Sequence, residues 1–263
     1  DGDATPILTA AMTAAKDFLT GTGVTVEGVG VSATGQVDSS TGVVIGTNGA
    51  IPHYEGVNIR EAMEEAFGLP ARVLNDANAA VLVGVRPEDF GDDHPLAGFV
   101  LDGRLYGGAR GIAGELGHFP LERDGRPCTC GNRGCLEQYA STTALVRLAC
   151  QATGEASLNG REIFARAARK DPTMLRVLAA WTADVAAGVT GLVHVFNPEM
   201  VLIGGGVSAQ EALFLSPLRE RVLAQVMPCF ATGLRVERAA LGNDAGLVGA
   251  AKWWMDSMEN RAT

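Results

Sequence analysis

The stretch Gly114–Glu137, GELGHFPLERDGRPCTCGNRGCLE, decides how the rest of the chain is interpreted. It holds one histidine and three cysteines, whereas the whole chain of 263 residues has only four histidines and five cysteines. Their spacing is His-x9-Cys-x-Cys-x4-Cys. Three thiolates and one imidazole form a closed tetrahedral set for zinc, with no coordination position left for an activated water. The stretch therefore predicts a structural zinc site formed by His118, Cys128, Cys130 and Cys135.

The competing interpretation of these cysteines is a group of three unrelated free thiols. Gly131 and Gly134 lie in the gap between the last two cysteines, where a tight knuckle is needed to bring both thiols to one ion. Their presence favours the metal site. The two other cysteines, Cys150 and Cys229, are expected to lie in helices among apolar neighbours.

The same stretch carries polar side chains that could contact a ligand. A histidine bound to zinc is neutral, with one ring nitrogen on the metal and the other available for a hydrogen bond. Glu115 lies three residues before His118, and Glu137 follows the last cysteine by two residues. Two carboxylates and an imidazole beside a rigid knuckle suit recognition of a polyhydroxylated molecule. The alternative is that both carboxylates are solvated surface groups.

Composition and charge narrow the class of protein. Hydrophobic residues make up 47% of the chain and charged residues 19%, as in ordinary globular proteins. No run reaches the ~18 uninterrupted apolar residues of a membrane span, and the first residues lack the layout of a secretory signal, so we expect a cytoplasmic location with no membrane partner. The formal net charge of −9 without a basic stripe argues against a nucleic-acid partner. Small-molecule or protein partners are expected instead.

The first part of the chain alternates strands and helices. Periodicity and capping residues predict a helix from residue 6 to about 20, strands within 24–38 and 42–45, a helix over 58–67 and a strand over 71–74. Gly35 interrupts the first strand region, as a ligand-lining turn or as a simple hairpin turn. Asn75 and Asp76 open an alanine-rich helix directly behind a strand. The aspartate there is either an N-cap or a carboxylate at the strand end, where α/β proteins bind ligands.

The part after the knuckle is richer in helix. Expected elements are a hairpin over 97–106, helices over 142–153, 160–169, 173–196 and 210–226, strands from 199 and near 234–237, and a terminal helix. Gly204, Gly205 and Gly206 follow the strand at 199, which suits either a nucleotide moiety or a tight loop. The order of elements predicts an α/β protein of two lobes, residues 1–101 and residues 102–263.

Several of these segments together resemble the ROK family of bacterial sugar kinases and sugar-responsive repressors. Residues 114–141 contain its ExGH element, the His-Cys-Cys-Cys spacing and the GCLE element in order. Further similarity lies in VGVSATGQVD, VLNDANAA, EMVLIGGGVS and LGNDAGLVGAA, which span most of the chain from about Gly28 onward. The resemblance implies an actin-like ATPase (ribonuclease H-like) fold, in which two α/β lobes form a cleft and the zinc knuckle lies in the larger lobe.

The resemblance also implies roles for particular residues. Asp76 would take the proton from the 6-hydroxyl of a hexose or hexosamine as that oxygen attacks the γ-phosphate of ATP, used with Mg²⁺. Positioning and charge stabilisation dominate phosphoryl transfer, so one aligned carboxylate suffices as the base. Sugar hydroxyls would be held by Asn75, Glu115, His118 and Glu137, with Gly35 and Asn48 lining the pocket. The nucleotide would lie against Gly204, Gly205 and Gly206.

Two features of the family pattern are missing from this sequence. Family kinases begin with a strand-turn-strand carrying a D-x-G-G-T phosphate loop, and they carry a second glycine-threonine-rich loop before the ExGH element. Here the chain runs from FGDDHP directly into LAGFVLDGRLY. Glycine-rich loops hold phosphates through backbone N–H groups. We expect that the two loops belong to a larger natural chain and are omitted here, with the parent an active, glucokinase-like hexose kinase.

Two other functions are compatible with parts of the sequence. A non-catalytic sugar-sensing module, as in the repressors of the family, would retain the sugar and zinc residues, but those proteins carry a helix-turn-helix and this acidic chain shows none. A zinc-stabilised scaffold without a ligand would need only the knuckle. The apolar seam of the helix over 173–196 and the family analogy suggest a homodimer or homotetramer.

Overall fold

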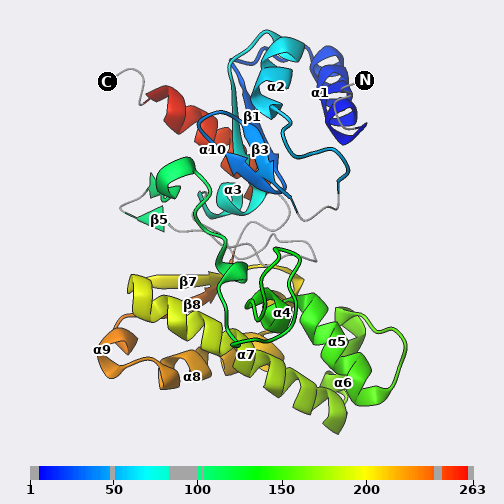
Figure 1. Ribbon diagram of the computed structural model, residues 1–263, viewed down its shortest axis with the longest axis vertical. Coiled ribbons are helices and arrows are strands. Elements are labelled where there is room, and N and C mark those ends of the chain that lie inside the picture. The colour runs from blue at the N-terminus through cyan, green and yellow to red at the C-terminus, as the bar shows by residue number, and fades with distance from the viewer. Residues whose placement is uncertain (1–5, 48–50, 83–99, 102–103, 240–244, 260–263) are drawn as a thin grey trace. The chain divides into compact units, whose positions relative to one another are not determined.

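The computed structural model describes residues 6–47, 51–82, 100–101, 104–239 and 245–259 (Figure 1). The chain divides into two compact units. The first contains the described residues up to 82, those from 100 to 115 and the C-terminal helix, and the second contains those from 116 to 239. This division differs from the predicted boundary after residue 101, because the end of the chain returns to the first unit.

The first unit is organised around a parallel strand pair. β1 (Val29–Ala33) pairs with β4 (Ala71–Asn75) in a register that places Ala33 opposite Asn75. β2 (Gln36–Asp38) instead pairs antiparallel with β3 (Val43–Gly46), so the predicted strand region does divide at Gly35. Gly35 has φ of +86°, a conformation that side chains rarely adopt. Both strand pairs contribute to one hydrophobic cluster, which includes the buried Val37, Val44 and Val73.

The helices of the first unit begin and end near the predicted residues. Asn58 accepts a hydrogen bond from Glu61 N, and Gly68 ends the helix in the left-handed conformation. These caps explain why the local sequence predicted that helix correctly. The remaining elements are α1 (Pro6–Thr22), α2 (Ile59–Phe67), α3 (Asp76–Leu82), β5 (Val100–Leu101) and β6 (Arg104–Leu105), the last two forming the predicted hairpin.

The C-terminal helix α10 (Ala245–Glu259) packs against β1, β4 and α3 (Figure 1). Glycines permit this close approach. A Cβ at Gly30 would lie 2.3 Å from the Ala250 carbonyl oxygen, and a Cβ at Gly249 would lie 1.7 Å from the Ala79 carbonyl oxygen. Trp254 Nε1 also donates to the Pro70 carbonyl at 3.0 Å. The contacts join residues far apart in the sequence, so local patterns could not predict where this helix packs.

The second unit is built around one long helix, α7 (Pro172–Phe196), which packs against α4, α5, α6 and α8. Trp181 is 1% exposed, donates its indole N–H to the carbonyls of Ala140 and Ser141, and stacks on Phe214 at a centroid distance of 4.6 Å. By length and hydropathy α7 could cross a membrane, but its apolar face is buried in the core of this unit. The neighbouring helices are α4 (Glu137–Ala140), α5 (Thr142–Thr153) and α6 (Gly160–Ala168).

A second parallel strand pair completes this unit. β7 (Met200–Ile203) pairs with β8 (Arg235–Arg238). The helix predicted over 210–226 is divided: a π-helical turn (Glu211–Leu215) precedes α8 (Ser216–Gln225). Pro217 has no N–H to donate and therefore occupies the first turn of a new helix. α9 (Pro228–Ala231) follows, and Cys229 on it is exposed, so the expectation of an apolar surrounding is wrong for this cysteine.

Candidate metal and substrate sites

The four predicted metal ligands lie together. The donor atoms of His118, Cys128, Cys130 and Cys135 are all within 4.8 Å of one another. Cys128 Sγ is 3.6 Å from His118 Nδ1, and Cys130 Sγ is 3.6 Å from Cys135 Sγ. Two thiolates on one tetrahedral zinc, each at ~2.3 Å, are separated by about 3.8 Å. The cluster is therefore compatible with a structural zinc ion.

Backbone turns bring the cysteines together in a segment with little regular structure. Short 3-10 turns cover Gly108–Arg110 and Leu116–His118, and isolated bridges join Pro120 to Cys135 and Pro127 to Arg133. Gly134 has φ of +73°, and a Cβ there would lie 1.7 Å from the Glu122 carbonyl oxygen. Only glycine fits this position. Gly134 is needed in the knuckle because its backbone angle and the nearby Glu122 carbonyl leave no room for a side chain.

Two thiols of the cluster, Cys128 and Cys135, have perturbed pKa values. Burial, followed by interactions with Cys130 and Cys128, raises the pKa of Cys135 to about 12. Burial acts in the same direction on Cys128, but hydrogen bonds from Cys130 and contact with His118 lower its pKa to about 7. Three thiolates packed this closely, two of them buried, would need a compensating positive charge. A bound metal ion would supply that charge.

His118 has the orientation expected of a ligand with two roles. Its Nδ1 faces the thiols, and its Nε2 lies 3.8 Å from Oε2 of Glu137. Glu137 is the first residue of α4, immediately behind the knuckle. The imidazole thus links the metal cluster to a partly exposed carboxylate. Glu115, by contrast, is exposed at the end of the first unit.

Two residues that the sequence analysis did not single out brace the knuckle. The guanidinium of Arg126 lies 4.7 Å from the ring centroid of Tyr139, and its Nη1 donates to the Gln138 carbonyl. The Tyr139 hydroxyl accepts a hydrogen bond from the Arg126 N–H at 3.0 Å. These contacts attach the cysteine loop to α4. Their spacing follows no periodic pattern, so the sequence offered no signal for them.

Asp76 begins α3 at the C-terminal end of β4. Its Oδ1 accepts hydrogen bonds from the Ala77 N–H at 2.8 Å and from the Asn75 amide at 3.1 Å. Capping of the helix falls to Asn75, whose Oδ1 accepts the Asn78 N–H at 3.2 Å. The Asn75 amide also donates to the Gly35 carbonyl at 2.7 Å. The structure thus brings Gly35, Asn75 and Asp76 together and assigns the cap to the asparagine.

Tyr54 is a further residue of this region that sequence reasoning missed. The side chain is buried, and its ring would be 3.9 Å from a Cβ at Gly35. Burial raises the pKa of the Tyr54 phenol, and the negative charge of Asp76 raises it further. The phenol therefore remains neutral beside the carboxylate. Asn48, predicted to line the same pocket, lies outside the described residues.

The three glycines after β7 form a turn in the second unit. Gly205 has φ of +81°, and its carbonyl accepts hydrogen bonds from both the N–H and the hydroxyl of Ser208. Gly206 begins a 3-10 turn, Gly206–Ala209. The turn is as tight as expected.

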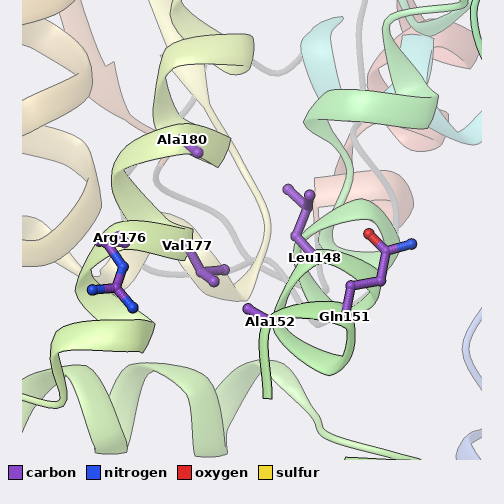
Figure 2. A pocket seen from close by; sticks show the side chains of 6 residues that line it. All are labelled: Leu148, Gln151, Ala152, Arg176, Val177 and Ala180. Atoms are coloured by element: carbon purple, nitrogen blue, oxygen red, sulfur yellow. The ribbon is translucent and has the colours of Figure 1, made fainter. Parts of the chain in front are cut away.

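A shallow apolar groove lies between α5 and α7 (Figure 2). Its volume is about 340 Å³. None of the predicted site residues lines it. The lining residues are Leu148, Gln151, Ala152, Arg176, Val177 and Ala180.

Comparison with known proteins decides the family. The sequence profile described as the ROK family matches residues 97–257. This chain belongs to the ROK family. The glucokinase of Thermotoga maritima is 34% identical over 224 residues, which cover 76% of this chain and 70% of that protein. A xylose repressor of Caldicellulosiruptor bescii is 30% identical over 218 residues, which cover 74% of this chain and 55% of that protein.

Solved structures of ROK proteins have the same fold. A ROK family glucokinase from Streptomyces griseus, in complex with glucose and AMPPNP, superposes with a TM-score of 0.75 at 31% identity and covers 93% of this chain and 87% of its own. A ROK hexokinase from Thermus thermophilus has a TM-score of 0.78 at 32% identity, with coverage of 96% and 87%. The predicted actin-like ATPase fold of the sugar kinases is confirmed by these neighbours.

Proposed function

We propose that this ROK chain is the sugar-binding body of an ATP-dependent, glucokinase-like hexose kinase and that Asp76 is its general base. The observation that carries the proposal is the division of labour at the start of α3. Asn75 accepts the Asn78 N–H, so the Asp76 carboxylate does not serve as the N-cap. It is held in place by the Asn75 amide and the Ala77 N–H at the end of a parallel strand. Ligands bind at such strand ends in α/β proteins.

In the proposed reaction the 6-hydroxyl of a hexose or hexosamine attacks the γ-phosphorus of ATP. The bond from that phosphorus to the β,γ-bridging oxygen breaks, ADP leaves, and the hydroxyl proton passes to an Asp76 carboxylate oxygen. The carboxylate contributes by aligning the hydroxyl and accepting its proton. Mg²⁺, brought with ATP, would neutralise phosphate charge. Gly204, Gly205 and Gly206 would lie against the nucleotide.

Recognition of the sugar is proposed to involve four polar side chains. Asn75, Glu115, His118 and Glu137 would bind ring hydroxyls, with Gly35 and Asn48 lining the pocket. Zinc held by His118, Cys128, Cys130 and Cys135 would fix the imidazole so that its outer nitrogen keeps one direction. All four coordination positions would be filled by protein atoms, so the metal would have a structural role. We also propose that the protein is a cytoplasmic homodimer or homotetramer.

The second candidate is a sugar-responsive regulator without catalytic activity. The observation that favours it is the similarity to the xylose repressor of C. bescii and to a ROK family transcriptional regulator of known structure, with a TM-score of 0.77 at 27% identity. In such a protein the same residues would bind sugar, and no phosphoryl group would be transferred.

The test is a coupled kinase assay on the complete gene product with glucose, N-acetylmannosamine and N-acetylglucosamine. We expect Asp76→Asn to lower kcat by roughly 10³-fold, because a positioned base contributes about 10²–10⁴ in rate, and to change the sugar Kd by less than about threefold. The control is Asp17→Asn, an exposed position on α1. Wild-type protein that binds a hexose but never phosphorylates it would favour the regulator. Equal activity of wild type and Asp76→Asn would show that Asp76 is not the general base.

A further inference from the structure

Asn78 is a buried polar residue on α3, two positions after Asp76. The residue is 3% exposed. Its Nδ2 donates to the Ala113 carbonyl at 3.2 Å, across 35 positions of sequence. Its Oδ1 is buried and has no hydrogen-bond partner among the residues that the structure describes. A buried amide that leaves its oxygen unpaired is unfavourable, so the single bond made by its nitrogen calls for an explanation.

The hydrogen-bonding partner fixes the orientation of this amide. The Ala113 carbonyl can only accept, so the NH₂ group must face it. The flipped amide would place two oxygens against each other and would lose the bond. An apolar side chain would avoid the unpaired oxygen, but it could not donate to Ala113. What Asn78 supplies, and an apolar side chain would not, is therefore the hydrogen bond that tethers Ala113 to α3.

Ala113 ends a tight turn in the first unit. Its N–H donates to the Gly107 carbonyl at 3.0 Å, and Gly108 and Gly111 within the turn have φ of +64° and +74°. A Cβ at Gly111 would lie 2.0 Å from the Ser39 hydroxyl oxygen, so the turn packs tightly on the loop after β2. Glu115 comes two residues later, where the chain leaves this unit. Fixing Ala113 therefore limits where the Glu115 backbone can lie.

We infer that Asn78 is a positioning residue that fixes the Glu115 segment against the helix carrying Asp76. The inference rests on the proposed function, in which Glu115 binds the sugar and Asp76 acts as the base. One side chain on α3 then sets the separation between the group that orients the sugar ring and the group that receives its proton. Displacements of about 1 Å in such an arrangement can lower rates about a hundredfold.

The experiment is a double-mutant cycle on the complete protein, read by calorimetric hexose binding and by kcat. Asn78→Ala is expected to weaken hexose binding about tenfold in the wild-type background and less than about twofold in Glu115→Gln, because the effect acts through that carboxylate. Asn78→Ser, which is too short to reach Ala113, should behave in the same way and serves if the alanine variant does not fold. Ala80→Gly is the matched control, because it weakens the same helix and leaves the tether intact.

Hydrogen exchange gives a readout that does not depend on sugar. Asn78→Ala should speed exchange of the backbone amides of residues 113–115 more than Ala80→Gly does. Unchanged exchange there would overturn the tether, and additive effects of Asn78→Ala and Glu115→Gln would overturn its action through Glu115. A wild-type protein that neither binds nor phosphorylates a hexose would overturn the proposed function, and with it the positioning role, whatever the exchange result.

Discussion

The start of α3 and the cysteine knuckle hold their polar groups by different means. Asp76 lies between a strand and a helix that pack on β1 and α10, and its neighbours belong to regular structure. The knuckle contains only short turns and isolated bridges. Two of its deeply buried side chains are the thiols of Cys128 and Cys135. The start of α3 is therefore held in place by the protein core. The knuckle, by contrast, depends on a link between its four ligand side chains, which one shared ion would provide.

This difference explains how each site resists change. A loop whose buried groups are thiols gains little hydrophobic stabilisation, so the proposed zinc would supply the free energy that a core supplies elsewhere. The strand end at Asp76 requires no metal to keep its shape. Perturbations chosen for one region should therefore leave the other intact.

Removal of the metal should have the largest effect. Cys135→Ser is expected to reduce zinc to well below one ion per chain and to destabilise the second unit by about 3 kcal/mol or more, because one buried ligand is lost. Cys229→Ser is the control, since that thiol is exposed and outside the cluster. Metal analysis would measure the zinc content. Hydrogen exchange should show that residues 119–136 lose protection in Cys135→Ser while β1 and β4 keep theirs. A knuckle that stays protected in metal-free protein would show that the core comparison is wrong.

Two glycine substitutions should separate the regions. Gly134→Ala places a methyl group against the Glu122 carbonyl in the knuckle, and Gly249→Ala places one against the Ala79 carbonyl between α10 and α3. Each should cost roughly 1–3 kcal/mol of unfolding free energy through overpacking, with added backbone strain at Gly134.

The readouts of this pair are zinc affinity and kinase activity. Gly134→Ala should weaken zinc binding and leave exchange in α3 unchanged, whereas Gly249→Ala should lower kcat by displacing Asp76 and leave the zinc content at wild-type level. Gly131→Ala serves as a milder control in the knuckle, because a Cβ there meets no described atom within 4 Å and only the positive φ is penalised. Equal loss of both properties in both variants would contradict separate control of the two sites.

The sequence predicted the parts of this structure that depend on neighbouring residues. The cap at Asn58 and the glycine stop at Gly68 determine helix ends locally, and the observed helix follows them. The clustering of the four candidate metal ligands could be predicted because their spacing lies within one short segment.

The features that sequence reasoning missed all depend on long-range contacts. The return of α10 to β1 depends on backbone approach at Gly30 and Gly249, which no periodicity reports. Tyr54 reaches Asp76 through tertiary packing, and Asn78 on α3 bonds to Ala113, 35 positions away; both positions resemble ordinary core and helix residues. The ambiguity at Asp76 is local instead: Asn75 and Asp76 are both suitable caps by sequence, and only the structure shows that Asn75 accepts the Asn78 N–H.

The smallest effect expected is electrostatic and reports on Asp76 alone. The pKa of the Tyr54 phenol is raised by burial and, second, by the charge of Asp76. Asp76→Asn should therefore lower the Tyr54 pKa part of the way toward its ordinary value near 10, since burial persists. Ultraviolet titration of the phenolate band would measure this, with Tyr106→Phe and Tyr139→Phe identifying the other two tyrosines.

The raised pKa of Tyr54 also makes the free energy of unfolding depend on pH in the alkaline range. Because the folded pKa of Tyr54 lies above the unfolded value, unfolded chains release this proton first as the pH rises past about 10, and the free energy of unfolding falls from that pH upward. Tyr54→Phe should remove the part of this fall in unfolding free energy that Tyr54 causes above pH ~10. At neutral pH, where the phenol is protonated in both states, chemical denaturation should show no contribution from its titration. A Tyr54 titration that does not respond to Asp76→Asn would mean that the phenol and the carboxylate are not neighbours in solution. The start of α3 would then be less rigid than its hydrogen bonds imply, and it would differ less from the knuckle than the structure indicates.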